Sequence, residues 1–261
     1  MGKKIFITGA GSGFGKLAAL TLAERGHHVT AGAHIGPQVQ ALRQEAKEKN
    51  ITLEVQKLDL LNSSDKKKAL EHDVDVLLNC AGVCEAGPLA EQPLNFIRSM
   101  FDVNVFYNLE LTQSFVRRMV EKRKGKIVFM SSMSGLVGFP LAGAYCASKH
   151  ALEAIAEALK LELEPFGIKV ATINPGPFKT GFNESGIDSI YQWYDPEQNF
   201  TPHQAIKDLE ATLAKQFDPN DVLDIIIETV ESEKNKFRNV WPRSMENDVR
   251  KSQGDAWEVK S

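Results

Sequence analysis

The chain has 261 residues, 43% of them hydrophobic and 25% charged, with a formal net charge of -3, which is typical of an ordinary globular protein. No basic stripe stands out, which argues against nucleic acid as a partner. The apolar run near the start is too short for a signal peptide or a membrane span, so we expect a cytoplasmic protein with no membrane partner.

Apolar runs alternate with amphipathic stretches from the first residue to about residue 180, the pattern of repeated strand–helix units. Most of the apolar runs are continuous in Val, Ile, Leu and Phe, as in strands covered by helices on both faces. The predicted strands are Lys4–Thr8, His28–Ala33, Thr52–Leu58, Val74–Asn79, Lys126–Ser131, Lys169–Asn174 and Asn239–Trp241.

Helices are predicted between these strands. They span Phe14–Arg25, Pro37–Lys49, Lys66–Glu71, Pro93–Lys122, Ala144–Phe166 and Pro219–Lys234. For the fourth, a break near Asp102 is the alternative to one continuous helix. Because strand–helix–strand crossovers are right-handed, the simplest topology is an α/β fold with a doubly wound parallel sheet of about seven strands. We expect residues 1–261 to form one domain.

Residues 181–217 interrupt this rhythm, because aromatic residues are mixed there with Gly, Asp and Pro. The segment is either a lid over an apolar site or a helical excursion packed against a neighbouring subunit, and both interpretations stay open. The tail, residues 243–261, is polar with the single aromatic Trp257, which predicts that it frays or docks on a partner chain.

A glycine-rich turn, "TGAGSGFG" from Thr8 to Gly15, follows the first predicted strand and opens the first helix. Glycines let the backbone approach a ligand closely, and the helix amino end favours negative charge. This context indicates a dinucleotide site in which the turn binds a pyrophosphate.

The spacing of this turn resembles the TGxxxGxG fingerprint of the short-chain dehydrogenase/reductase family, in its compact branch of about 250 residues. Five further segments match the family in order: "LNCAG" from Leu78 to Gly82, "DVNV" with Asn104, "MSSMSG" with Ser132, Tyr145 with Lys149 in YxxxK, and "NPGPFKT" from Asn174 to Thr180. Cys80 replaces the second Asn of the family's NNAG. The resemblance covers residues 3 to about 180 and implies a Rossmann-type fold.

Tyr145 and Lys149 lie one turn apart on a predicted helix, so a phenol and an ammonium share one face. A nearby cation favours the ionised phenol, so we expect Lys149, together with the nicotinamide charge, to lower the pKa of Tyr145. The resemblance implies that Tyr145 is the general acid/base, that Ser132 holds the substrate oxygen, and that Asn104 binds a water that links Lys149 to solvent. No metal is required, and the cysteines Cys80, Cys84 and Cys146 lack zinc-ligand spacing.

The cofactor is expected to be NADP or NAD. Ala33 stands where an acidic residue would mark NAD, and His34 follows it where an arginine would mark NADP, so the preference for NADP is slight. Asp59 either meets the adenine or caps a helix. The residues expected to bind the cofactor are Gly9, Ser12, Gly13, Phe14, Gly15, His34, Asp59, Asn79, Ala81, Gly82, Tyr145, Lys149, Pro175, Gly176 and Thr180.

The expected substrate is a bulky apolar alcohol or ketone, because few charges lie among the residues predicted near it. These are Val83, Cys84, Phe139, Leu141, Phe182, Tyr191 and Trp193. The resemblance also implies a homo-oligomer, a dimer or tetramer, through helices 93–122 and 144–166. A non-catalytic dinucleotide-binding redox sensor is the alternative function. It has no need of Ser132, Tyr145, Lys149 and Asn104 together.

Overall fold

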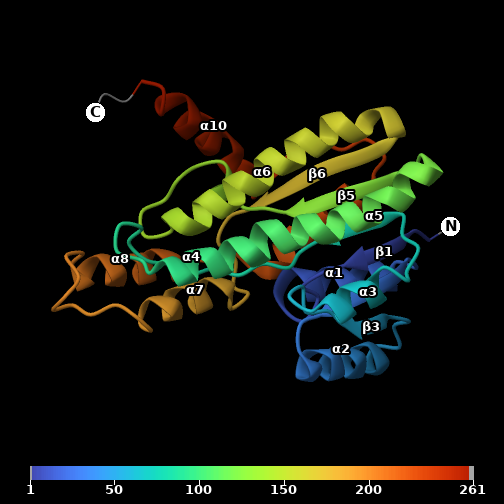
Figure 1. Ribbon diagram of the computed structural model, residues 1–261, viewed down its shortest axis with the longest axis horizontal. Helices are drawn as coiled ribbons and strands as arrows, with labels where there is room; N and C mark the ends of the chain where they lie inside the picture. The colour runs from blue at the N-terminus through green and yellow to red at the C-terminus, as the bar shows by residue number, and fades with distance from the viewer. Residues whose placement is uncertain (1, 259–261) are drawn as a thin grey trace.

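The apolar runs of the sequence pair into one sheet of seven strands, all parallel, in the order β3-β2-β1-β4-β5-β6-β7 (Figure 1). The computed structural model describes residues 2–258. This arrangement confirms the predicted doubly wound α/β sheet. The strands are β1 (Lys4–Ile7), β2 (His28–Ala33), β3 (Glu54–Lys57), β4 (Val76–Asn79), β5 (Gly125–Met130), β6 (Ile168–Pro175) and β7 (Arg238–Trp241).

Helices cover both faces of the sheet because alternate strand residues point to opposite sides. In β1, Ile5 and Ile7 pack beneath one helical layer and Phe6 beneath the other, each at most 1% exposed. Burying one such side chain contributes about 1.5–3 kcal/mol. One layer holds α1 (Gly13–Glu24), α2 (Gly36–Glu48) and α9 (Leu223–Glu231), and the other holds α3 (Ser63–Ala69), α5 (Asn108–Lys122) and α6 (Gly143–Leu163).

The long helix predicted for residues 93–122 is continuous but changes its winding in the middle. α4 (Leu94–Phe101) passes through a π-helical stretch, Asp102–Tyr107, directly into α5. The wider turn brings the buried amides of Asn104 and Asn108 to the sheet side of the helix, where they bond the backbone after β4. The alternative of a break near Asp102 is therefore realised as a π-bulge.

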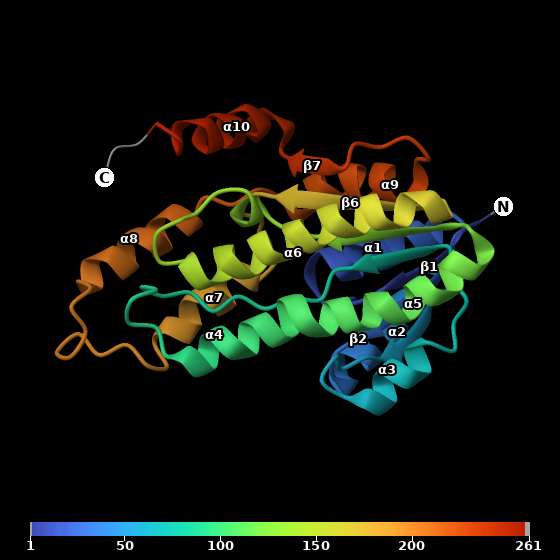
Figure 2. The same cartoon turned by 45° about the horizontal axis from the view of Figure 1, so that its top comes forward.

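Residues 181–217 are largely helical. Gly181, with φ +80°, starts α7 (Phe182–Ile190), and Pro202 precedes α8 (His203–Leu213). The loop between them is held by the Glu91 carboxylate, which accepts hydrogen bonds from the amides of Phe200 (2.7 Å) and Thr201 (3.0 Å). Both helices lie beside α4 at one end of the molecule (Figures 1 and 2).

The polar tail does not fray within the described residues, and it docks on its own chain. It forms α10 (Glu246–Asp255), whose Val249 is 3% exposed and packs with Met133, Leu136 and Val240. Gln253 Nε2 donates to the carbonyl of Leu136 at 3.1 Å. The expected fraying is therefore wrong up to residue 258, and docking of the tail on a partner chain stays a prediction. Residues 259–261 lie outside the described part.

No helix within residues 2–258 combines the length and the apolar character that crossing a membrane requires.

The Glu231 carboxylate joins the ends of α1 and α9. It accepts hydrogen bonds from Arg25 Nε at 2.6 Å and Arg25 Nη2 at 2.8 Å, and it contacts His27 Nε2 at 2.9 Å. The guanidinium hydrogen bonds, helped by His27, lower the pKa of Glu231 to about 2. A carboxylate with a depressed pKa stabilises the fold above its ordinary pKa and loses this effect as the pH falls through the depressed value.

We therefore expect Glu231→Gln to lower the free energy of unfolding by about 1 kcal/mol at pH 7, and by much less near pH 2. Urea unfolding followed by circular dichroism at pH 7, 4 and 2.5 measures this difference. Glu228→Gln, which disrupts the exposed pair with Arg243, is the control. A Glu231→Gln deficit that stays constant over this pH range would contradict the assignment.

Candidate functional site

A cavity of about 970 Å³ opens at the carboxyl ends of the strands. It lies where the strand order reverses, since β1 has β2 on one side and β4 on the other, and the loops that follow them part. The predicted site residues that line it are Gly9, Ser12, Gly13, Phe14, Gly15, His34, Asp59, Ala81, Gly82, Val83, Cys84, Ser132, Phe139, Tyr145, Lys149, Pro175, Gly176, Thr180 and Phe182.

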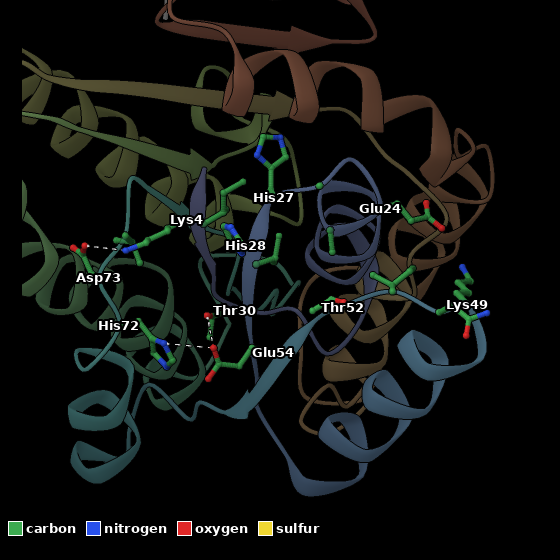
Figure 3. A pocket seen from close by; sticks show the side chains of 17 residues that line it. Lys4, Glu24, His27, His28, Thr30, Lys49, Thr52, Glu54, His72 and Asp73 are labelled. Atoms are coloured by element: carbon green, nitrogen blue, oxygen red, sulfur yellow. Dashed lines mark hydrogen bonds and ion pairs between the residues drawn. The ribbon is translucent and has the colours of Figure 1, made fainter. Parts of the chain in front are cut away.

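A second hollow, of about 820 Å³, lies at the opposite, amino-terminal ends of the strands (Figure 3). Its charged side chains are engaged with their neighbours: Glu54 contacts Thr30 at 3.2 Å and His72 at 3.7 Å, and Lys4 pairs with Asp73 at 3.4 Å. None of the predicted site residues lines this hollow. The larger cavity is therefore the candidate site.

The glycine turn forms the floor of the cavity at the start of α1. A Cβ on Gly9, whose φ is +65°, would lie 2.7 Å from the Ala81 backbone nitrogen, and one on Gly15 would lie 2.4 Å from the Gly9 carbonyl oxygen. The Thr8 hydroxyl accepts hydrogen bonds from the backbone amides of Cys80 and Ala81, each at 3.0 Å. Only glycine fits this close contact between the loops after β1 and β4, and the helix amino end faces the cavity, so the turn fits a pyrophosphate.

The far end of the cavity carries His34 and Asp59. His34 Nε2 lies 3.8 Å from Asp59 Oδ1, which also accepts the amide of Leu61 at 2.9 Å. Asp59 thus holds a turn and lines the cavity, whereas the cap of α3 is Asn62, so the alternative of a helix cap at Asp59 is wrong. Of the described residues that line the cavity, Lys149 is the single Lys or Arg, so His34 is the group at this end that could meet a phosphate.

Tyr145, Lys149 and Ser132 meet at the middle of the cavity. Tyr145 and Lys149 are 9% and 4% exposed on the first turns of α6, and Lys149 Nζ lies 5.8 Å from the phenol ring centre. This ammonium donates to the carbonyl oxygen of Met130 at 3.0 Å. Ser132 follows β5, and its hydroxyl, which accepts a hydrogen bond from the Ser134 amide at 3.1 Å, lies in the lining of the same cavity.

Burial controls the protonation of this pair. It raises the pKa of the Tyr145 phenol, and the hydrogen bond with Ser132 opposes the shift only in part. Burial also lowers the pKa of Lys149 to about 8. The expected lowering of the phenol pKa is wrong for the protein by itself, because desolvation outweighs the attraction of a cation that is bonded to Met130. At neutral pH the phenol is protonated, which suits a proton donor.

Five predicted residues lie outside the cavity lining, two of them asparagines bonded within the core. Asn79 Nδ2 donates to Thr112 Oγ1 at 2.9 Å. Asn104 Nδ2 donates to the Val83 carbonyl at 2.9 Å and to Ser148 Oγ at 3.1 Å, and Asn104 Oδ1 accepts the Val83 amide at 2.8 Å. Both asparagines stabilise the wall of the cavity through these hydrogen bonds. That Asn104 binds a water linking Lys149 to solvent stays a prediction.

The other three, predicted near the substrate, point elsewhere. Tyr191 is 49% exposed and donates to Glu210 at 2.6 Å, whereas Trp193 packs against Gly87. Leu141 turns away from the cavity in the left-handed region, with φ +57°. The end of α7 at Ile190 explains the first two, because Ser185 and Ser189 of α7, and Gln192 in the turn after it, line the cavity instead.

Sequence reasoning missed several lining residues, among them Glu85 directly after the predicted Cys84. The i, i+4, i+7 spacing of Ser185, Ser189 and Gln192 was the available signal once residues 182–190 are taken as a helix. The missed lining residues with side chains toward the substrate half are Glu85, Ser185, Ser189, Gln192, Leu209, Thr212, Leu213 and Met245, and Gln38 and Leu61 are missed at the other end.

A buried carboxylate supports the site from behind. Glu153, one turn beyond Lys149 on α6 and 3% exposed, accepts hydrogen bonds from Asn174 Nδ2 at 2.6 Å and Arg238 Nε at 2.9 Å. Asn174 Nδ2 also donates to the Ser132 carbonyl at 3.2 Å. The negative charge of Glu153 raises the pKa of Lys149 against the larger lowering by burial.

The comparisons with known proteins identify the family. The family model described as short chain dehydrogenase matches residues 3–189. The chain belongs to the short-chain dehydrogenase/reductase family. As a member of it, the protein is an oxidoreductase.

Two curated relatives of this short-chain dehydrogenase/reductase are oxidoreductases by name. The oxidoreductase YusZ of Bacillus subtilis is 34% identical over 238 residues, covering 87% of this chain and 84% of the relative. The 3-ketodihydrosphingosine reductase of Bacteroides thetaiotaomicron is 36% identical over 188 residues, covering 69% and 66%.

Solved structures share the fold. A short-chain dehydrogenase from Streptomyces avermitilis has a TM-score of 0.81 and 27% identity, covering 99% of this chain and 93% of that one. A short-chain dehydrogenase from Sphingobium yanoikuyae, solved with NADPH, has a TM-score of 0.76 and 22% identity, covering 99% and 97%.

No three His, Cys, Asp or Glu side chains come together as a metal site within residues 2–258.

Removing the charge of Glu153 should change the titration of Lys149. We expect Glu153→Gln to lower the pKa of Lys149 further below about 8, because a buried negative neighbour is lost. NMR titration of the lysine Cε and Nζ resonances measures this shift. Glu157→Gln is the matched control, because Glu157 also binds Arg238, at 2.7 Å, but is exposed. Equal Lys149 titrations in the two variants would contradict the role given to Glu153.

Proposed function

We propose that this short-chain dehydrogenase/reductase interconverts a secondary alcohol and a ketone or aldehyde, with Tyr145 as general acid/base. The observation that carries the proposal is the meeting of Tyr145, Lys149 and Ser132 in one cavity, whose other half is the glycine turn after β1. A redox sensor that only binds dinucleotide gains nothing from burying a phenol and an ammonium side by side.

The chain's own residues divide the work. The bound dinucleotide supplies or accepts the hydride. In reduction, the protonated phenol of Tyr145 gives its proton to the carbonyl oxygen, and the Ser132 hydroxyl donates a hydrogen bond to the same oxygen. The Lys149 ammonium then stabilises the negative charge left on the phenol oxygen. In oxidation Tyr145 takes the proton from the alcohol.

The residues proposed to lie near the substrate support a bulky, apolar substrate. Val83, Cys84, Phe139 and Phe182 line the cavity beside Tyr145, and Phe182 packs 5.8 Å from the Tyr145 ring. In this proposal α7 and α8, within residues 181–217, form the lid over the substrate and exclude water from the hydride transfer.

For the dinucleotide, we propose NADP over NAD by a small margin. No carboxylate stands at Ala33 to reject a 2′-phosphate, and the exposed His34 is available to bind one.

We also propose that the protein is a cytoplasmic homo-oligomer, a dimer or tetramer. The support is that large apolar side chains are exposed on the helices expected to form the subunit contact. Leu94, Phe106 and Leu161 are 62%, 57% and 61% exposed.

Tyr145→Phe should reduce kcat/KM for ketone reduction by at least about 100-fold, because it removes the only proton donated to the oxygen. Binding of NADPH should persist. The measurement is absorbance of the reduced nicotinamide with a panel of apolar ketones. Tyr191→Phe removes a hydroxyl that bonds Glu210 outside the cavity, and it should keep full activity. Turnover that survives in Tyr145→Phe rejects the proton role, and a wild type that binds NADPH but turns over no ketone favours the sensor.

His34→Ala should reduce the ratio of NADPH to NADH affinity several-fold, because it removes the group proposed to meet the 2′-phosphate. Titration of tryptophan fluorescence with each dinucleotide gives the two dissociation constants. His28→Ala, a histidine of the opposite hollow, is the control. An unchanged ratio in His34→Ala would remove His34 from the account of cofactor choice.

A further inference from the structure

We propose that the substrate carries, besides its reacting carbon–oxygen group, a hydrogen-bond donor, either a hydroxyl or a protonated amine, and that the Glu85 carboxylate binds this donor. This inference rests on the proposed function, because it names the substrate class of the same cavity. It adds one charged group to a substrate half in which few charges are expected.

Glu85 lies in the loop after β4, between the site and the lid. It lines the same cavity as Tyr145, together with Ser189 of α7. The loop is fixed on both sides of the residue: Gln92 Nε2 donates to the Glu85 carbonyl at 3.0 Å, and the Ala86 amide donates to the Gly186 carbonyl at 3.1 Å. The backbone that carries Glu85 is therefore held at a defined place beside the cavity.

The carboxylate lacks a cationic partner. Within residues 2–258, Glu85 takes part in no ion pair, and the nearest cavity cation, Lys149, is bonded to Met130. The Ser189 hydroxyl donates to the Gly186 carbonyl at 2.6 Å, and its hydrogen bond with the Glu85 carboxylate lowers the pKa of that group against the larger rise from burial. A single hydroxyl occupies only one of the several acceptor positions of a carboxylate. Acceptor positions on the Glu85 oxygens are thus left for a ligand.

Burying the Glu85 carboxylate costs free energy, and this cost makes the site selective for a substrate that carries a hydrogen-bond donor. Burial raises the pKa of Glu85, since a charged carboxyl loses hydration beside apolar side chains. A hydroxyl or an ammonium at this place restores the lost hydrogen bonds, whereas a methyl group leaves the carboxylate unpaired. A site built to bind a donor in this way rejects the analogue that lacks it.

The surroundings define the rest of the molecule. Phe139, Phe182, Leu209 and Leu213 line the same cavity as Glu85. The substrate is accordingly amphipathic, with an apolar body and one polar substituent away from the reacting carbon.

The test uses ketones matched in size that differ in one substituent: hydroxyl, primary amine or methyl. We expect kcat/KM of the wild type to favour one of the donor ketones over the methyl ketone by at least about 10-fold. Glu85→Leu should abolish or reverse this preference, mainly through KM. Glu184→Gln, on the outer face of α7 and bonded to Gln216, should leave it unchanged.

Glu85→Gln separates the two donors. Its amide oxygen still accepts from a hydroxyl but carries no charge, so a hydroxyl preference should survive and an amine preference should fall at least about 10-fold. NADPH binding and thermal unfolding of both variants establish that they fold, and if Glu85→Leu does not, Glu85→Gln and the wild-type preference decide.

Equal kcat/KM values for all three substituents in the wild type, or the same preference in wild type and Glu85→Leu, would overturn this inference and leave the oxidoreductase function standing. Absence of turnover on every ketone would instead contradict the proposed function.

Discussion

The site depends on keeping an ammonium charged inside the protein, one helical turn from a buried phenol. Desolvation alone disfavours the Lys149 charge, and it lowers the pKa of this lysine to about 8. Two features oppose it: the Met130 carbonyl, at the end of β5, accepts a hydrogen bond from Nζ, and the Glu153 carboxylate lies one turn further along α6. The position of the ammonium is thereby fixed by the sheet as well as by its own helix.

The need to stabilise the Lys149 charge also links the cavity wall around Ser132 to strands β6 and β7. Asn174 on β6 bridges Glu153 and the Ser132 backbone, and Arg238 on β7 neutralises the buried carboxylate. A buried charge without such partners is strongly destabilising, so the polar side chains of two neighbouring strands are matched to one helix. The phenol of Tyr145, by contrast, stays protonated, because burial raises its pKa by more than the Ser132 hydroxyl lowers it.

The two halves of the cavity are built by different means. The dinucleotide half relies on backbone contact, with Gly9 and Ala81 so close that no side chain fits between them. The substrate half relies on side chains of α7 and α8, which the Glu91 carboxylate fastens to the loop after β4. Variation in α7 and α8 can therefore reshape their half of the cavity without disturbing the glycine turn.

The sequence alone determined the features that depend on local pattern: the seven strands, the glycine turn, and the shared helix face of Tyr145 and Lys149. Periods of hydrophobicity and positions that need glycine are encoded within a few residues. Tertiary structure decided the rest. Whether Tyr191 or Ser189 faces the cavity depends on the rotation of α7, and whether Asn79 reaches a ligand depends on Thr112, more than thirty residues away. Only the assembled fold sets the pKa of Tyr145, because desolvation comes from all the elements that surround a group and has no signature in the neighbouring sequence.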